Sequence, residues 1–409
     1  MNGIKWFAKM MADYYIYIIK RFISRLKNHF HIKGKKLDHL HFETLSNFKG
    51  NAVVSYIVHP FYNGNDFSSI IRHQNFRETI EMVNILLDMG YNVDLFDFTC
   101  NNAELLQKFN KKSDLIIGFG FPYNFFINQV QNKESKKLFY STGTYIDFQN
   151  KMIEERTKNA NEHFHLNIKP IRIVKDVVKE EYFKSDGIIQ IGSSFTLKTF
   201  PKEIRNKIYL IRQSTFEILF SSVYNKNYEL GKRNFLWFGS YGGVLKGLDI
   251  LLDYFSEHKE LNLYIVGMPE FEFVKSFKKY LFGQSNIKYY GWLPITSNKL
   301  LEIASFCDFI IFPSASEGMP GSVLNMMRLG LIPIVSEVAG FDEIDKFGFV
   351  IKMEELNKEG LKNKVVEVQR ISSIELTKRA RDGQKYVVEN FNLCSFGRDF
   401  KSAIEFFTK

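Results

Sequence analysis

The segment CDFIIFPSASEGMPGSVLNMMRLGLIPIVS, residues 307–336, decides the fold class of this chain. Its first apolar run predicts a buried strand over 307–314, and LIPIVS predicts a second strand over 331–336. Pro320 favours the first helical position and Gly330 the position after the last turn, so a helix is predicted between the strands. A strand, a helix and another strand in this order predict a parallel sheet with its faces covered by helices.

The same alternation runs through most of the 409 residues. Further strands are predicted at 51–58, 91–98, 113–120, 136–143, 186–192, 206–211, 234–240, 261–267 and 287–291. Helices are predicted between them, with a long polar one near 147–165 and two more over 372–407. The stretch 212–233 is polar and irregular and separates two halves. The sequence therefore predicts an α/β protein of two Rossmann-like, doubly wound domains that face each other across a cleft.

The predicted domain organisation follows from these patterns. It comprises a basic amphipathic arm (1–45), an N-terminal Rossmann-like acceptor domain (46–215), a C-terminal Rossmann-like domain (216–385) and a C-terminal helix packing back toward the N-terminal domain (386–409).

Most of the net charge of +10 belongs to the N-terminal arm. Residues 1–36 contain nine Lys and Arg residues and a single acid, Asp13, so the rest of the chain is near neutral and no nucleic acid partner is expected. On a helical wheel the aromatic and aliphatic side chains of the arm lie opposite its lysines, which is typical of a helix at a lipid interface. The alternative is a helix packed on the body of the protein. Because the apolar runs are too short to span a bilayer and the three cysteines are scattered, we expect a cytoplasmic protein attached peripherally to the inner membrane surface.

A glycine-rich turn follows the predicted strand 234–240. Gly242 and Gly243 permit close backbone approach, and Lys246 stands at the start of the next helix. Backbone amides and an ammonium at a helix N-terminus suit a phosphate. The alternative is a tight turn with an exposed lysine. Neither GxGxxG nor GxxxxGK[ST] is present, which disfavours simple dinucleotide dehydrogenases and P-loop enzymes.

A second anion-accepting helix N-terminus is predicted at EGMPGSVLN, 317–325. The amides of Gly321 and Ser322 begin the helix and have no acceptor within it. Glu317, just before the helix, is placed to accept hydrogen bonds from the hydroxyl groups of a polyol. Asn325 lies two turns further on and can reach the other end of the same ligand. Two such sites in one domain suit a diphosphate.

The segment PSASEGMPGSVLNMMRLGLIPIVSEVAG (313–340) resembles the donor-binding signature of retaining GT-B glycosyltransferases, especially glycosyltransferase family 4 (glycosyl transferases group 1). The signature positions matched are Ser314, Glu317, Gly318, Pro320, Gly330 and Pro333. The Lys246-Gly247 pair and YYGWLP (289–294) agree with it, and the resemblance covers residues 234–409.

This resemblance implies roles for individual residues. Glu317 would contact the hydroxyl groups of the donor sugar and Lys246 the pyrophosphate, and these two are the predicted catalytic residues. The remaining predicted donor-binding residues are Gly242, Gly243, Gly318, Gly321, Ser322 and Asn325.

Two residues depart from the family pattern. Asn325 stands where the family has a second glutamate, which binds the ribose hydroxyls, and Ser240 stands where an arginine usually follows the strand glycine. The second departure removes a phosphate cation, and Arg72 from the facing domain is the predicted substitute.

The predicted acceptor side uses residues of the first half: Arg72, His73, Thr142, Gly143 and Thr144. His73 could carry a proton, although a lone histidine at a helix start is more often a surface or packing residue. Thr144 could instead cap a helix. No Asp-x-Asp occurs, so no metal and no cofactor are expected, and the nucleotide diphosphate sugar is a substrate.

The predicted function is transfer of a sugar from a nucleotide diphosphate sugar to a saccharide or lipid-linked acceptor, with retention, without a metal, in surface polysaccharide biosynthesis. The alternatives are a sugar-nucleotide epimerase of GT-B fold and a non-catalytic, membrane-bound scaffold that binds nucleotide sugars. The departures at Ser240 and Asn325 favour the last of these.

Overall fold

The computed structural model describes residues 38–61, 73–109, 111–217, 219, 221 and 223–409. Residues 1–37 of the predicted arm (1–45) and most of the loop before His73 lie outside these residues. The chain divides into two compact units, the first with residues 1–138, 216–218 and 408 and the second with 139–215, 219–407 and 409. These units are not the same segments as the predicted domains. The predicted domain limits therefore stay a prediction.

Two sheets carry the fold. The seven-stranded sheet has the order β1-β3-β2-β4-β5-β6-β7, with β1 (His39–Phe42), β2 (Gly50–Tyr56), β3 (Tyr91–Asp97), β4 (Leu115–Gly118), β5 (Lys136–Ser141), β6 (Gly187–Ile191) and β7 (Ile208–Ile211). The six-stranded sheet has the order β10-β9-β8-β11-β12-β13, with β8 (Asn234–Phe238), β9 (Asn262–Val266), β10 (Ile287–Tyr289), β11 (Phe309–Phe312), β12 (Ile332–Ser336) and β13 (Phe349–Ile351). The six-stranded sheet is parallel throughout.

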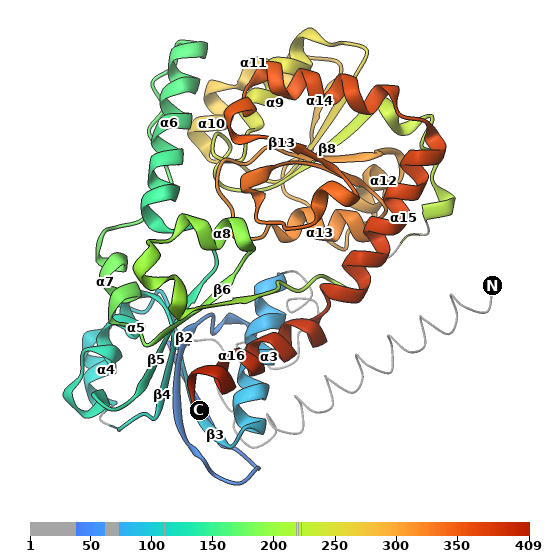
Figure 1. Ribbon diagram of the computed structural model, residues 1–409. Coiled ribbons are helices and arrows are strands. Elements are labelled where there is room, and N and C mark those ends of the chain that lie inside the picture. The colour runs from blue at the N-terminus through green and yellow to red at the C-terminus, as the bar shows by residue number, and fades with distance from the viewer. Residues whose placement is uncertain (1–37, 62–72, 110, 218, 220, 222) are drawn as a thin grey trace. The chain divides into compact units, whose positions relative to one another are not determined.

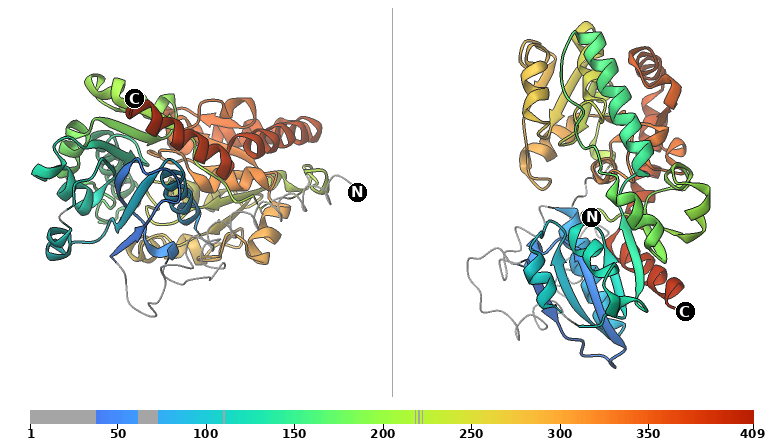
Figure 2. Two further views of the ribbon diagram at one scale, coloured as in Figure 1. Left: turned by 90° about the horizontal axis from the view of Figure 1, so that it is seen from below. Right: turned by 90° about the vertical axis from the view of Figure 1, so that its left-hand side faces the viewer.

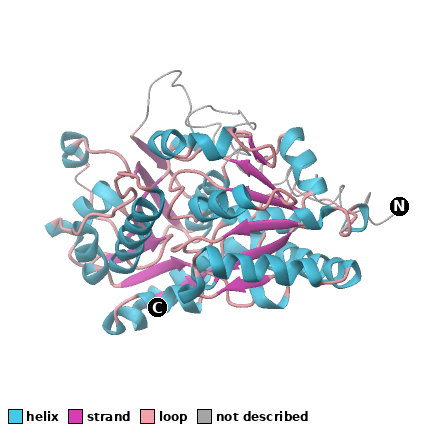
Figure 3. Cartoon of the chain, turned by 90° about the horizontal axis from the view of Figure 1, so that it is seen from above, coloured by secondary structure: helices cyan, strands magenta, loops and turns pink. Residues whose placement is uncertain are grey.

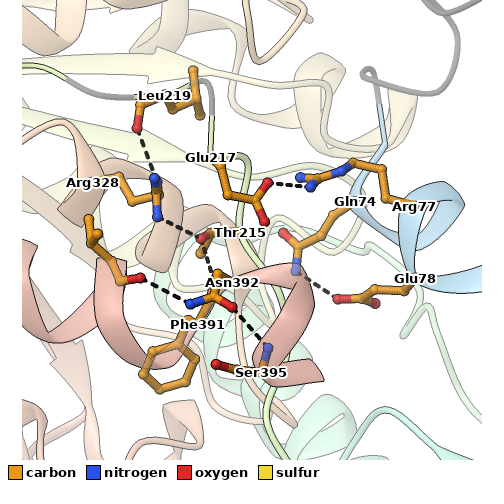
Figure 4. Close-up of polar contacts among 11 residues, drawn as sticks. Gln74, Arg77, Glu78, Thr215, Glu217, Leu219, Arg328, Phe391, Asn392 and Ser395 are labelled. Atoms are coloured by element: carbon orange, nitrogen blue, oxygen red, sulfur yellow. Dashed lines mark hydrogen bonds and ion pairs between the residues drawn. The ribbon is translucent and has the colours of Figure 1, made fainter. Parts of the chain in front are cut away.

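The first unit is built on β2, which pairs in parallel with both β3 and β4, while β1 is an antiparallel edge. Its helices are α3 (Gln74–Asp88), α4 (Ala103–Lys108) and α5 (Gly120–Ile127). A buried ion pair joins Arg77 of α3 to Glu217 (Figure 4). The Arg77 guanidinium also lies 5.3 Å from the ring centroid of Phe216. This pair ties the short segment 216–218 to the first unit.

The second unit contains the remaining helices. They are α6 (Ile146–Phe164), α7 (Val177–Lys184), α8 (Ser194–Thr199), α9 (Leu248–Glu257), α10 (Phe271–Ser276), α11 (Lys278–Phe282), α12 (Asn298–Phe306), α13 (Gly321–Arg328), α14 (Lys358–Arg370), α15 (Ser373–Asn390) and α16 (Leu393–Phe407). Helices α9, α11 and α14 cover one face of the six-stranded sheet and α12, α13 and α15 the other (Figure 1). Figure 3 shows helices on both sides of the strands. Its central strands β8 and β11 are almost fully buried, as expected for a sheet covered on both sides.

Each strand predicted from the sequence is present, usually ending one or two residues early. The sequence analysis did not identify the edge strands β1 and β13, which have four and three residues. Short edge strands carry too few residues for an alternation pattern. The α/β class and the two doubly wound sheets are thus confirmed.

The helix α13 is anchored at its C-terminal end by the fully buried Arg328 (Figure 4). Its Nε donates to the carbonyl of Leu219 at 3.0 Å and its Nη1 to Thr215 Oγ1 at 3.3 Å. The Arg328 carbonyl in turn accepts from Gln384 Nε2 of α15 at 2.6 Å. A cation near a helix C-terminus also interacts favourably with the helix dipole. Arg328 therefore holds the C-terminal end of α13 in place, while the candidate site lies at its N-terminal end.

The last helix, α16, packs on β6 and β7 (Figure 2). Arg212, just after β7, forms a two-pronged ion pair with Asp399 at 2.7 Å, and Phe406 contacts the ring of Tyr209 at 5.5 Å between centroids. A side chain on Gly187 would overlap Phe407. The chain end is therefore held by both charge and ring contacts.

Within the described residues, no helix is both long enough and apolar enough to span a bilayer.

We expect Arg156→Ala to lower the free energy of unfolding of the second unit by about 3–5 kcal/mol, the usual cost of stranding a buried charge. Arg156 Nη2 donates to both carboxylate oxygens of Asp249 at 2.8 and 2.9 Å, and both residues are buried. Urea titration followed by circular dichroism measures the change.

Lys158→Ala is the matched control, because Lys158 is on the same helix and pairs with Glu162 at the surface. If both variants unfolded at the same urea concentration, the ion pair would not stabilise the fold.

Candidate functional site

Two loops at the carboxyl ends of neighbouring parallel strands form the site. The chain leaves β8 into a glycine turn that ends at Gly247, and it leaves β11 into the loop 313–320. The loops are joined by a hydrogen bond from the amide of Ala315 to the carbonyl of Leu245 at 2.8 Å. Gly247 has a φ of 71°, and a Cβ there would lie 2.3 Å from the carbonyl oxygen of Pro313. This contact brings Lys246 and Glu317 into one site.

Glu317 is held in a defined, partly exposed position. Its Oε1 accepts a hydrogen bond from Ser314 Oγ at 3.1 Å, and its amide donates to the carbonyl of Val338 at 3.3 Å. Ser314 is fully buried, and its own carbonyl accepts from the hydroxyl of Ser336. The carboxylate therefore has one fixed oxygen, while the side chain remains accessible to a ligand.

The backbone of Gly318 lies very close to two neighbouring segments of the chain. A Cβ at this residue would lie 2.2 Å from the carbonyl oxygen of Thr142 and 2.8 Å from that of Ile191. The Gly318 carbonyl accepts from Thr196 Oγ1 at 3.2 Å. Only glycine fits here, so the loop after β11 is locked against the loops after β5 and β6.

Helix α13 begins one residue later than predicted. Pro320 has an extended backbone (ψ 106°) and is the N-cap, so Gly321 and Ser322 are the first two helical residues. Their amides have no acceptor within the helix, and no acid lies in its first turn. Gly330, with a φ of 79°, follows the helix as predicted. The arrangement is that of an anion-accepting helix start.

Asn325 is almost fully buried and turned toward its own helix. Its Nδ2 donates to the carbonyl of Gly321 at 2.7 Å, one turn back. The predicted contact between Asn325 and a ribose stays a prediction.

Lys246 lies two residues before α9, at the end of the glycine turn. Burial lowers the pKa of its amine below the ordinary value for lysine, while the carboxylates of Glu317 and Glu270 oppose this shift. No carboxylate of the described residues forms an ion pair with Lys246, so this buried ammonium is well suited to bind an anion.

The glycine turn already holds a carboxylate. The amides of Gly242 and Gly243 both donate to Glu270 Oε2, at 3.0 and 3.1 Å. Gly242 has a φ of 101°, a backbone conformation that favours glycine. A phosphate that used these two amides would have to displace the Glu270 carboxylate. The roles predicted for Gly242 and Gly243 in donor binding stay predictions.

The segment Thr142–Thr144 meets the loop after β11. The hydroxyls of Thr144 and Ser316 are hydrogen-bonded at 2.6 Å, and both residues are buried. Helix α6 has Tyr145 as its N-cap, so Thr144 does not cap it. Gly143 contributes its carbonyl to Gln190 Nε2 at 2.8 Å. The three predicted residues therefore lie against the candidate donor loop.

The structure does not test the other two residues of the predicted acceptor side, Arg72 and His73, against this cluster. Arg72 lies outside the described residues. His73, in the first unit, is exposed and precedes α3 without a side-chain capping bond, and its ring lies 4.8 Å from that of Phe76. In the part of the chain that the structure describes, no cluster of His, Cys, Asp and Glu could hold a metal ion.

Sequence reasoning missed Glu270, Ser316 and Gln190. Glu270 follows Gly267 and Pro269 after β9, a position at which a carboxylate at a strand end could have been noticed. Ser316 and Gln190 carried no signal, since a buried serine and a strand glutamine have no motif of their own.

Comparison with known proteins bears on the same segment. Residues 232–370 match the family model of the glycosyl transferases group 1. This match, about a third of the chain, confirms the resemblance inferred from the loop after β11. None of the curated protein sequences matches the chain.

Solved structures extend the similarity to most of the chain. A sucrose-phosphate synthase from Thermosynechococcus elongatus is 13% identical with a TM-score of 0.61, covering 87% of this chain and 98% of its own. HepE of Anabaena, solved with UDP-glucose, is 13% identical with a TM-score of 0.55, covering 87% and 100%. TarM of S. aureus is 14% identical with a TM-score of 0.49, and the match spans 75% of this chain and 58% of TarM. The fold is that of the GT-B glycosyltransferases.

We expect Gly318→Ala to lower the melting temperature by several degrees, because its methyl group would overlap two backbone carbonyls. Gly143→Ala is the matched control. There an added Cβ meets only the end of the flexible Gln149 side chain, at 3.2 Å. Differential scanning fluorimetry compares the two. Equal melting temperatures would show that the loop after β11 can move away from its neighbours.

Proposed function

We propose that this protein transfers a sugar from a nucleotide diphosphate sugar to an acceptor. One observation carries the proposal: the Ser314-bound carboxylate of Glu317 precedes the open amides of α13, in a loop that is hydrogen-bonded to the turn carrying Lys246. A sugar diphosphate offers hydroxyl groups to the carboxylate of Glu317. Its negative charge suits the amides of α13 and the ammonium of Lys246. The family match over 232–370 and the GT-B fold support this assignment.

The residues of the site divide the chemistry between them. Glu317 accepts hydrogen bonds from hydroxyl groups of the donor sugar and orients its anomeric carbon. The Lys246 ammonium and the amides of Gly321 and Ser322 stabilise the negative charge that grows on the diphosphate as the glycosidic bond breaks. Because binding an anion favours the charged amine, the donor itself would offset the lowered pKa of Lys246.

The proposed stereochemistry is retention without a metal ion. In a front-face reaction the bond from the anomeric carbon to the diphosphate breaks on the side where the acceptor oxygen attacks. The acceptor's proton then passes to the departing phosphate, so the protein needs no nucleophile. This suits a site whose fixed groups bind charge and hydroxyls.

Two other functions would use the same binding groups. A sugar-nucleotide epimerase would convert the donor without an acceptor, and a non-catalytic scaffold would bind the donor unchanged. Analysis of the sugar after incubation, with and without saccharide acceptors, separates all three.

We expect Glu317→Ala to lower kcat/KM for sugar transfer by about 100-fold or more, since hydrogen bonds to a charged group contribute roughly 1.5–3 kcal/mol each. Glu354→Ala, which removes an exposed carboxylate in the same unit, is the control and should keep full activity. A radiolabelled-donor assay measures both, and circular dichroism checks folding. Full activity of a folded Glu317→Ala variant would refute the site assignment.

The acceptor is proposed to be a saccharide or a lipid-linked saccharide at the inner membrane surface, in surface polysaccharide synthesis. The support is the sequence of residues 1–36, with nine basic residues and one acid.

Deletion of residues 1–36 is therefore expected to abolish sedimentation with vesicles that contain anionic lipid, and the full-length protein should lose its binding at high salt. Neutral vesicles are the control. Binding of the shortened chain at the full-length level would show that this segment is not the anchor.

A further inference from the structure

Arg172 has an unusual backbone conformation. Its φ is 65°, in the left-handed region, which only His165 shares among the described non-glycine residues. Such residues persist where their surroundings hold them, and they concentrate at functional sites. Here Gln149 Nε2 donates to the Arg172 carbonyl at 3.1 Å, and Asn150 bonds both the amide and the carbonyl of Val174, at 2.9 and 2.8 Å. Two side chains of α6 thus fix the loop that carries Arg172.

The side chain of Arg172 lies against the glycine turn of the candidate site. A Cβ on Gly242 would be 3.1 Å from Arg172 Cδ and 3.5 Å from its Nη1. The residue is exposed, and across the described ranges no hydrogen bond or ion pair engages its guanidinium. A glycine at 242 therefore makes room for an arginine that is available to an incoming ligand.

Arg172 is also close to Lys246 in electrostatic terms. Burial is the largest cause that lowers the pKa of the Lys246 amine, and the positive charge of Arg172 lowers it further. The two cations lie near the end of a parallel strand and repel each other. An anion bound between them would lower their electrostatic energy. Glu270 accepts hydrogen bonds from the amides of the same turn, but among the described residues it forms no ion pair with either cation.

The donor-binding signature leaves a cation to be found. Ser240 stands where an arginine is usual, and it is exposed in the structure. Arg72, the substitute predicted from the sequence, lies outside the described residues. Arg172 belongs to a loop without a recognisable motif, and it reaches the glycine turn that follows Ser240.

We propose that Arg172 is the second cation of the diphosphate site, supplied by the loop between α6 and α7 in place of an arginine at residue 240. This inference rests on the proposed function for the identity of the ligand. The Arg172 guanidinium would bind two phosphate oxygens side by side, whereas the Lys246 ammonium acts as a point charge. Together they would hold the leaving diphosphate.

The test uses the full-length chain and inorganic pyrophosphate, titrated by calorimetry at low salt. Arg172→Gly removes the cation and suits the left-handed backbone, so its melting temperature should equal or exceed that of the wild type. We expect its pyrophosphate affinity to fall at least 10-fold, and Arg172→Lys to be intermediate. Lys175→Ala removes an exposed cation of the same loop and should stay within about twofold of wild type.

Wild-type affinity of Arg172→Gly for pyrophosphate would overturn the inference, as would an equal loss in Lys175→Ala. Transfer assays separate this result from the proposed function. If no nucleotide sugar is a donor for the wild type but pyrophosphate binding depends on Arg172, the function fails and the anion site stands. If the wild type transfers sugar and Arg172→Gly does so with unchanged kcat/KM, the inference alone fails.

Discussion

The backbone at Gly318 lies so close to the carbonyls of Thr142 and Ile191 that no side chain fits between them, and the candidate site depends on this contact. Gly340 adds a third constraint, since a Cβ there would overlap the Gly318 carbonyl. Glu317 immediately precedes Gly318, and α13 starts three residues after Gly318. A loop fixed at this point therefore fixes both the carboxylate and the first amides of the helix. Such positioning by packed backbone is what a binding constellation needs if its geometry is to be preserved.

The strands and the two glycine-bearing loops were predictable because their signals are local. An apolar run, a glycine and a proline act on the residues beside them, and parallel strands bring their carboxyl ends to one edge. Pro320 shows the limit of this reasoning, since a proline fits both the N-cap and the first helical position and only ψ distinguishes them. What connects the site is not local. Thr144 and Ser316 are 172 residues apart, and Glu270 is 28 residues from Gly242. Nothing in either short segment specifies its partner.

The asparagine at residue 325 has a structural explanation in its bond to Gly321. An amide can donate to a carbonyl one turn back, whereas an ionised glutamate can only accept. Asn325 therefore orders the first turn of α13, the turn that presents the amides of Gly321 and Ser322. It also keeps a negative charge away from a helix start suited to anions. The departure from the family pattern thus exchanges a charged hydrogen-bond acceptor for a more ordered helix start.

The two anion-accepting turns of the second unit are not equivalent. The amides of Gly242 and Gly243 are already bonded to a carboxylate of the chain itself, so that turn is organised before any ligand arrives. The first amides of α13 have no such partner within the helix. A phosphate that binds at α13 gains new hydrogen bonds, whereas one that binds at the glycine turn must first break the two made by Glu270. The free-energy difference favours α13 over the glycine turn as the place where backbone amides would hold the proposed diphosphate. It leaves the glycine turn to position the cationic side chains beside it.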